Sequence, residues 1–303
     1  MGELGSIMER MTRSAAITHV ILDYDGTCTD IPPTVEKFLG DYFEELNRRV
    51  FQGALVKAEW GDALETVRKA SPDAGWTLRT TPCAPAAADP YILAGEAAQY
   101  LCREKAKREE IPREVFAVAD EANRAQPRPE LEAVLRAIEA KRAHVTFISN
   151  SGIAKIQPTI AKLFGGKLPD FIRIVEGGSK YSIAEPLLGD PDALGGAFLR
   201  LFRDLPGAIA VPGLARPVYL RRANYATAIS KALGGDDALL PHTVFCGDIW
   251  EMDLAMPFHL GANVHLVTRA APFDTYRYER EQIEIAAHRG ASSDDLGGIL
   301  RWF

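Results

Sequence analysis

Hydrophobic residues along this chain follow two patterns, which predict two kinds of element. Residues 18–27 (THVILDYDGT) begin with a short, mostly apolar run that stops at charged residues and a glycine, which is typical of a strand buried on both faces of a parallel sheet. From residue 127 onward, segments with helical spacing alternate with similar short runs, and this indicates a parallel α/β sheet. The predicted helices are 129–143, 153–164, 220–233 and 251–261, and the predicted strands are 144–150, 171–175, 243–248 and 263–269.

The stretch between the first strand and this alternation has a different character. Its apolar residues recur at helical spacing, and no comparable strand lies among them. A Pro- and Ala-rich segment, residues 80–90, interrupts it and is a predicted loop. The helices predicted here are 33–51, 54–70, 94–110 and 112–125.

These patterns together predict the fold class and the domains. We expect a Rossmann-like, doubly wound parallel α/β core domain formed by residues 14–30 and 127–303. An all-helical domain, residues 31–126, is inserted after the first strand. Residues 182–217 are longer than an ordinary connection, and we interpret them as a further insertion with its own helix over 192–205. The tail from Pro272 is predicted to be helical.

The composition excludes several classes of protein. The chain has 303 residues, of which 47% are hydrophobic and 25% charged, with a net charge of −6. Such a chain has no overall attraction for nucleic acid or for an anionic membrane, and no apolar run reaches the roughly 20 residues that a membrane helix needs. None of the four cysteines stands in a C-x-x-C spacing, so we expect reduced thiols in a cytoplasmic protein. The oligomeric state stays open.

Polar residues that could carry chemistry follow three of the predicted strands. They are Asp23 and Asp25 after the first, Ser149 and Asn150 after the second, and Asp248 and Asp253 after strand 243–248. Because ligands bind beyond the carboxyl ends of parallel strands, we expect these side chains to share one crevice. Clustered carboxylates repel unless a cation offsets their charge, and oxygen ligands without paired His or Cys suggest Mg²⁺. A carboxylate at such a site can attack phosphorus and form an aspartyl-phosphate.

Three motifs here resemble a known family. DYDGT at 23–27, ISNSG at 148–152 and GDIWEMD at 247–253 resemble the first, second and fourth signatures of the haloacid dehalogenase (HAD) superfamily, and the helical block resembles its type-1 cap. The resemblance covers the whole predicted sheet domain. It implies a hydrolase of the phosphatase-like branch, because members that cleave carbon–halogen bonds typically lack the second acid of the first signature, here Asp25.

The resemblance also implies roles for the acids. Asp23 is the nucleophile. Asp25 is the general acid that protonates the leaving oxygen and then the base that activates water. Asp23, Asp248 and the backbone carbonyl of Asp25 bind Mg²⁺, with Asp253 close to the metal or in its surroundings.

Phosphate binding is expected from the same loops. The hydroxyl of Ser149 hydrogen-bonds a phosphoryl oxygen, as the resemblance implies. Backbone N–H groups around Tyr24 and Asn150 can donate to the remaining oxygens. Gly26 permits a close approach of the backbone, and Thr27 can cap the following turn.

The third signature of the superfamily is a Lys or Arg near the start of the helix that precedes the G-D strand. We assign it to Arg222, which opens the predicted helix 220–233 and could grip phosphate oxygens with two N–H groups. Its neighbour Arg221 and Lys180, in the loop after the third strand, are the alternatives.

The expected activity is an Mg²⁺-dependent phosphoric monoester hydrolase acting on a small phosphorylated metabolite. A phosphonate hydrolase or a sugar phosphomutase of the same superfamily is an alternative, and the former needs a Schiff-base lysine from the cap, for which Lys57 is available. A non-catalytic scaffold that kept the fold is the alternative from another class. The aromatic residues Trp60, Trp76 and Tyr91 are expected to pack the cap core rather than to contact substrate.

Overall fold

The central element of the structure is a six-stranded parallel sheet. A computed structural model of the chain describes residues 16–77, 81–106, 110–184 and 196–303. In the order β10-β9-β8-β1-β4-β5, every neighbouring pair of strands is parallel. The strands are β1 (His19–Leu22), β4 (His144–Phe147), β5 (Ile172–Ile174), β8 (Thr243–Gly247), β9 (Asn263–Val267) and β10 (Gly290–Ser293).

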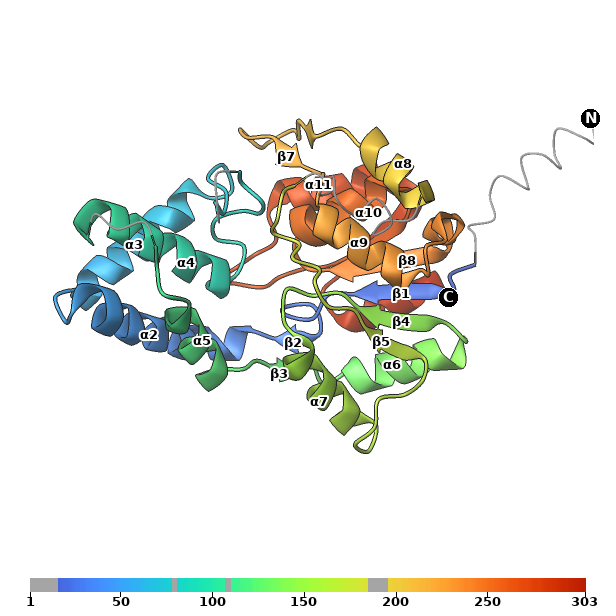
Figure 1. Cartoon of the computed structure of the whole chain (residues 1–303), viewed down its shortest axis with the longest axis horizontal. Coiled ribbons are helices and arrows are strands. Elements are labelled where there is room, and N and C mark those ends of the chain that lie inside the picture. Colours follow the sequence, from blue (N-terminus) through green and yellow to red (C-terminus); the bar gives the residue numbers. More distant parts are fainter. Residues whose placement is uncertain (1–15, 78–80, 107–109, 185–195) are drawn as a thin grey trace, which may run out of the picture.

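Helices cover both faces of this sheet (Figure 1). Along β1, Val20 and Leu22 belong to one apolar cluster and Ile21 to another, so the strand is buried on both faces as its unbroken apolar run predicts. This confirms the doubly wound parallel α/β core. One face carries α6 (Leu131–Ala140), α7 (Ile153–Leu163) and η7 (Leu296–Trp302), and the other carries α8 (Gly196–Asp204), α9 (Ala223–Ala232), α10 (Ala255–His259) and α11 (Arg277–Ile285).

The tail from Pro272 was predicted to be helical, and the structure corrects this, because it is only partly helical. α11 and η7 lie there, but β10 adds the edge strand of the sheet beside β9. Its sequence, GASS, has no apolar run. An edge strand pairs on one side only, and of these four residues only Ala291 is buried. The hydrophobic pattern therefore carried no signal for it.

The insertion after β5 leaves and rejoins the core at one point. The N–H of Ala184 donates to the carbonyl of Arg221 at 3.1 Å, and the N–H of Ala223 donates to the carbonyl of Ala184 at 3.1 Å. Between these points lie α8 and a short antiparallel hairpin, β6 (Ala208–Ile209) and β7 (Val218–Tyr219). The insertion thus extends to Arg221 rather than ending at residue 217, and residues 192–195 of its predicted helix lie outside the described residues.

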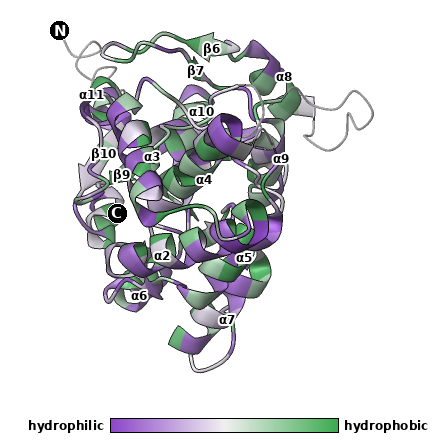
Figure 2. Ribbon diagram, turned by 90° about the vertical axis from the view of Figure 1, so that its left-hand side faces the viewer, coloured by the Kyte–Doolittle hydropathy of each residue, from purple (hydrophilic) through white to green (hydrophobic). Residues whose placement is uncertain are grey.

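Residues 31–126 contain the four predicted helical regions, and the chain enters and leaves them through paired strands. β2 (Thr29–Asp30) pairs antiparallel with β3 (Gln126–Pro127). The helices are α2 (Val35–Leu46), α3 (Lys57–Ala70), α4 (Pro90–Leu101) and α5 (Arg113–Ala122), with single π turns η2 (Asn47–Phe51) and η3 (Cys102–Ala106). Hydrophobic and hydrophilic residues alternate along them (Figure 2), and their apolar residues form one cluster that Phe273 of the core joins. Among all described residues, no helix is long and apolar enough to cross a membrane.

The division into core and cap gives a first testable prediction. Replacing residues 32–125 with a short Gly/Ser linker should leave a core that unfolds cooperatively, because β2 and β3 already hold the two ends side by side. Circular dichroism and urea unfolding measure this. Ile249, Met252 and Phe273 would lose their cap contacts, so lower solubility is expected. A core without any cooperative transition would contradict the domain division.

Candidate active site

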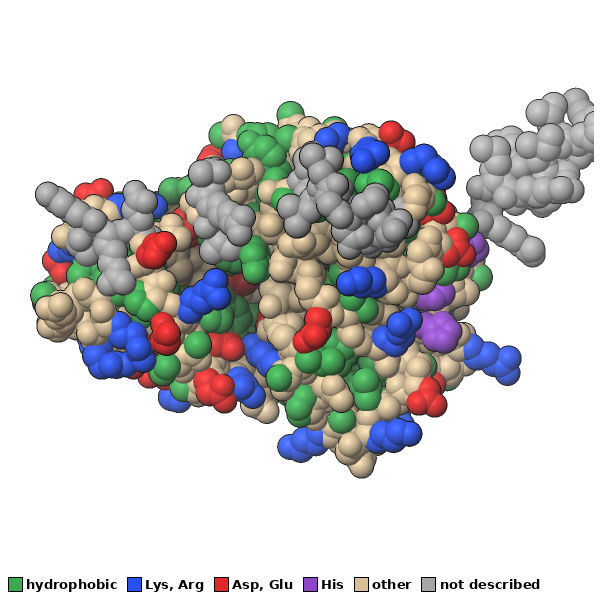
Figure 3. Space-filling view, in the orientation of Figure 1, with side chains coloured by type: hydrophobic (Ala, Val, Ile, Leu, Met, Phe, Trp, Pro, Cys, Tyr) green, Lys and Arg blue, Asp and Glu red, His purple; other side chains and the backbone are tan. Residues whose placement is uncertain are grey.

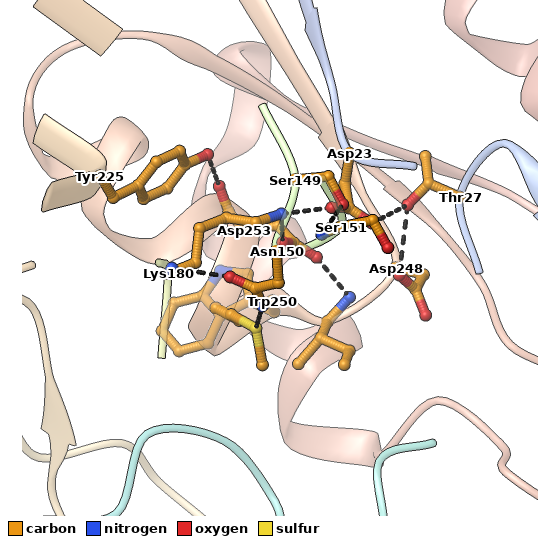
Figure 4. Close-up of polar contacts among 12 residues, drawn as sticks. Asp23, Thr27, Ser149, Asn150, Ser151, Lys180, Tyr225, Asp248, Trp250 and Asp253 are labelled. Atoms are coloured by element: carbon orange, nitrogen blue, oxygen red, sulfur yellow. Dashed lines mark hydrogen bonds and ion pairs between the residues drawn. The ribbon is translucent and has the colours of Figure 1, made fainter. Parts of the chain in front are cut away.

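Three buried carboxylates meet at the carboxyl edge of the sheet. Asp23 follows β1, and Asp248 and Asp253 follow β8. One oxygen from each lies within 4.8 Å of the others, and all three side chains are almost fully buried (Figure 4). The sequence-based expectation that these strand ends share one crevice agrees with this arrangement.

Two glycines permit the close approach of these acids. Gly26 has a φ of +79°, and a Cβ there would lie 2.6 Å from Oδ2 of Asp248. A Cβ at Gly247 would lie 2.3 Å from the Cβ of Asp253. Since real Cβ atoms do not approach this closely, any larger residue at either position would displace a carboxylate.

Lys180 forms ion pairs with two of these carboxylates, and Arg269 donates to the backbone carbonyl of Asp248. The Nζ of Lys180 contacts Oδ1 of Asp23 and lies 2.5 Å from Oδ1 of Asp253. Its side chain is only 1% exposed, and the ring of Tyr225 lies 5.8 Å from Nζ. The backbone of Lys180 is held as well, since its N–H donates to Oδ1 of Asn150 at 2.8 Å.

Arg222 does not contact the carboxylates, and its assignment as the third-signature cation is wrong in position. Its Nη1 donates to the carbonyl of Lys180, and its Nη2 donates to the carbonyl of Cys83 in the cap at 2.8 Å. The other alternative, Arg221, donates to the carbonyls of Arg203 and Leu205. The insertion after β5 explains why Lys180 was not chosen. It separates Lys180 in sequence from α9, although the two lie side by side in space.

Burial and mutual repulsion leave the acidic cluster short of positive charge. Burial raises the pKa of Asp23 to about 7, although Lys180 opposes the rise. Burial and then Asp253 raise the pKa of Asp248 well above its ordinary value. Burial alone would lower the pKa of Lys180, but Asp23 and Asp253 raise it. One lysine therefore does not neutralise three carboxylates, and the cluster favours a bound proton or cation.

A threonine hydroxyl and a backbone N–H group orient these carboxylates. Thr27 Oγ1 donates to Oδ1 of Asp248 at 3.2 Å and to Oδ2 of Asp23 at 3.4 Å. The N–H of Ile249 donates to Oδ2 of Asp253 at 3.0 Å. Thr27 therefore does not cap the turn, as was predicted, but bridges the carboxylates of Asp23 and Asp248. In its place, the hydroxyl of Thr29 accepts the N–H of Gly26 at 3.0 Å.

The carboxylate of Asp25 is held apart from this cluster. Ser151 Oγ donates to its Oδ2, and Lys155 Nζ on α7 lies 3.0 Å from its Oδ1. Lys155 also donates to Oδ1 of Asp120 on cap helix α5 at 3.1 Å. The side chain of Asp25 is thus absent from the group that could hold a metal through carboxylates, and only its backbone carbonyl is left for that predicted role.

The remaining predicted site residues lie in the surrounding loops. Ser149 is buried, and its Oγ accepts the N–H of Ser151 at 3.2 Å. Asn150 uses its side chain to hold Lys180 and donates from Nδ2 to the sulfur of Met252 at 3.1 Å. The Tyr24 ring is buried against Phe147, so only its backbone is left to face a ligand.

The donor set fits Mg²⁺. Asp23, Asp248 and Asp253 offer hard carboxylate oxygens within 4.8 Å of one another, and no imidazole or thiolate belongs to this group in the described parts of the chain. Burial and then neighbouring carboxylates raise the pKa values of Asp23 and Asp248, so their charged forms are disfavoured. A divalent cation would favour those charged forms.

Several residues of the site carried weak signals in the sequence. Lys155 and Asp120 belong to amphipathic helices, where a charged residue ordinarily faces solvent, and Ser151 is one of many serines. Lys57, the candidate Schiff-base lysine, has a side chain that is 82% exposed and lies 3.9 Å from Glu44. It therefore lacks the desolvation that such a lysine needs.

The cap aromatics differ in their surroundings. Trp60 stacks on Tyr42 in the cap core with ring centroids 5.8 Å apart. Trp76 packs against Tyr181 of the core, with centroids 5.7 Å apart. Tyr91 lies against Phe38 and under Lys155, whose Nζ is 5.8 Å from its ring centroid. Trp60 therefore packs inside the cap, as predicted. Trp76 and Tyr91 instead lie at the boundary between the cap and the α/β domain.

The comparisons with known proteins give a likeness of fold. Neither family models nor curated proteins match the sequence. Similar solved structures include an L-2-haloacid dehalogenase from Xanthobacter autotrophicus (13% identity, covering 94% of this chain and 97% of that one, TM-score 0.42). A second is a predicted phosphoglycolate phosphatase from Haemophilus somnus (15% identity, covering 94% of this chain and 97% of that one, TM-score 0.46). A third is a haloacid dehalogenase-like family hydrolase from Streptococcus pneumoniae (12% identity, covering 95% of this chain and 98% of that one, TM-score 0.48). By name these neighbours include both dehalogenases and a phosphatase.

The uncompensated charge predicts that stabilisation by Mg²⁺ depends on pH. In the metal-free protein the folded-state pKa of Asp23 is raised, so folding retains a proton there that the unfolded chain releases, and stability is lost as pH rises toward 7. Mg²⁺ must displace such protons at low pH. Its stabilising effect should therefore be small at pH 5.5 and reach about 2–3 kcal/mol at pH 8 with free Mg²⁺ about 100 times its Kd.

Urea unfolding with and without MgCl₂ at the two pH values measures this difference, and Asp248→Asn, which removes one proposed ligand, is the control that should show little response. Equal stabilisation at both pH values, or an equal response of Asp248→Asn, would contradict the assignment of the metal ligands.

Proposed function

We propose that this chain is an Mg²⁺-dependent phosphoric monoester hydrolase of the HAD superfamily that works through an aspartyl-phosphate. The observation that carries the proposal is the separation of its carboxylates into two groups. Lys180 gathers Asp23 and Asp253 beside Asp248, while Asp25 is held apart by Ser151 and Lys155. A carboxylate poised for attack and another poised for proton transfer are what ester hydrolysis requires.

The same division argues against a carbon–halogen hydrolase. A halide ion leaves without a proton, so the second acid would have no task in that reaction. Three carboxylates that favour a cation would also have no task in that reaction. A transferring phosphoryl group, by contrast, needs positive charge around it.

The chemistry proceeds in two displacement steps. An oxygen of Asp23 attacks phosphorus and forms the P–O bond of the acyl-phosphate, while the bond from phosphorus to the ester oxygen breaks and Asp25 gives its proton to that oxygen. Asp25 then takes a proton from water as the water oxygen attacks phosphorus. The bond to Asp23 breaks, and phosphate and free Asp23 result.

The other residues support these steps. Mg²⁺, held by Asp23, Asp248 and Asp253, would supply charge that offsets the phosphoryl oxygens. Lys180 keeps Asp23 in place and adds a fixed positive charge. Ser149 and the N–H groups around Tyr24 and Asn150 can donate to phosphoryl oxygens. The cap excludes bulk water, and the recess visible between cap and core on one face marks where substrate would enter (Figure 3).

The test of this proposal uses a panel of phosphorylated metabolites with Mg²⁺. Turnover should disappear in excess chelator and return with Mg²⁺. Asp23→Asn should lower kcat by at least about 10³-fold, since an amide cannot form the acyl-phosphate. Release of inorganic phosphate measures both effects. Halide release from a 2-haloacid in chelator, without phosphate release from any ester, would instead establish a dehalogenase.

Because Lys180 rather than Arg222 contacts Asp23, we expect Lys180→Met to lower turnover more than Arg222→Met does. Lys180→Met should lower kcat by about 10²–10³-fold, because its ammonium contacts the nucleophile. Arg222→Met loses its contacts to the carbonyls of Lys180 and of Cys83 in the cap, so it should raise KM and lower kcat less than Lys180→Met does. Steady-state kinetics on one substrate separates the two. A crippling Arg222→Met beside a nearly neutral Lys180→Met would restore the assignment made from the sequence.

A further inference from the structure

We propose that Lys155 is a positioning residue that couples the orientation of Asp25 to the seating of the cap. This inference rests on the proposed function, in which Asp25 is the proton-transfer group. Lys155 lies on core helix α7, 3.0 Å from Oδ1 of Asp25 and 3.1 Å from Oδ1 of Asp120 on cap helix α5. We call these two contacts the Lys155 clamp. No motif of the sequence marks either Lys155 or Asp120.

The surroundings make this pair of contacts more than a surface ion pair. The side chain of Lys155 is 13% exposed, and those of Asp25 and Asp120 are each 20% exposed. Ion pairs screened in this way from water are stronger than solvated ones. Tyr91 on cap helix α4 adds a third contact, with its ring centroid 5.8 Å from Nζ. Two helices of the cap therefore contact one lysine of the core.

Oδ2 of Asp25 accepts a hydrogen bond and Oδ1 forms an ion pair, and only the ion-pair partner reaches the cap. Ser151, which holds Oδ2, belongs to the core loop after β4. Lys155, which holds Oδ1, is shared with Asp120. When the cap seats, Asp120 fixes the lysine, and the lysine fixes the carboxylate that delivers the proton.

The charges of the clamp make the effect of removing each member distinct. Without Lys155, two carboxylates face each other across the boundary between cap and core with nothing between them. Without the charge of Asp120, Lys155 still pairs with Asp25. Lys155→Met should therefore be more harmful than Asp120→Asn, and Asp120→Asn should partly rescue Lys155→Met by removing the repulsion.

The choice of leaving group separates positioning from general damage. An alkyl phosphate needs a proton on its departing oxygen, so its turnover depends on the orientation of Asp25. 4-Nitrophenyl phosphate releases a stable anion and needs that proton far less. A variant that misplaces Asp25 slows the first substrate selectively, whereas a variant that disturbs the fold slows both.

The experiment compares ethyl phosphate with 4-nitrophenyl phosphate for the parent chain, Lys155→Met, Lys155→Arg, Asp120→Asn and the double variant. Lys162→Met, an exposed lysine on the same helix, is the matched control. In Lys155→Met the ratio of kcat for the alkyl to the aryl ester should fall at least about tenfold, with partial recovery in Lys155→Arg and in the double variant. Lys162→Met should keep the ratio of the parent.

Amide hydrogen exchange followed by mass spectrometry measures the same coupling without turnover. Lys155→Met should speed exchange in peptides from α5 and from residues 23–30, and Lys162→Met should not. A parent chain inactive on both esters would refute the proposed function, and the exchange data would still decide the clamp. Unchanged exchange in α5, or an equal loss of kcat on both esters, would overturn the proposed role of Lys155.

Discussion

The arrangement of this site depends on the ion pairs of Lys180 with Asp23 and Asp253. Three carboxylates crowd into a buried edge of the sheet, where their repulsion is poorly screened. The lysine makes that crowding tolerable, although burial and then neighbouring carboxylates still raise the pKa values of Asp23 and Asp248. A buried pair of this kind is weak evidence for stability. Its value here is that it keeps acidic oxygens together and ready for a cation.

Much of the surrounding structure keeps that lysine in place. Its N–H is held by Asn150 of the loop after β4, and its carbonyl by Arg222, the residue just before α9. Asp253, its second partner, is fixed by the N–H of Ile249 and, at its carbonyl, by the hydroxyl of Tyr225 at 2.9 Å. The cation therefore lies where four segments of the core converge, and none of these contacts is adjacent to it in sequence.

The sequence predicted what depends on local pattern and missed what depends on long-range closure. The buried strands, the cap helices and the acids at the strand ends follow from hydrophobic period and short motifs. β10 could not be recognised because an edge strand does not require an apolar run. Lys180 was passed over for Arg222 because the insertion places about 40 residues of sequence between Lys180 and α9, although the chain closes again between Ala184 and Arg221. Lys155 and Asp120 look like ordinary helical surface residues until two helices meet.

The contacts between cap and core combine apolar packing with polar contacts. In the apolar part, Ile249 and Met252 pack with Trp76, Ile92, Ala84 and Ala88 of the cap, and Phe273 joins the apolar cluster of the cap helices. Other contacts are polar, and a contact to water would offset part of the free energy lost when one of them breaks.

Three of those polar contacts link the cap to residues near the carboxylates. Arg222 joins the carbonyl of Cys83 in the cap to that of Lys180, and Lys155 joins Asp120 to Asp25. Arg216 joins the carbonyl of Pro72 to the buried carboxylate of Glu251, three residues beyond Asp248. Each links a cap residue to a residue in or beside the acidic edge of the sheet. In the proposed mechanism, a cap attached in this way controls more than access, because its seating would fix Lys180, Asp25 and the loop after β8 together.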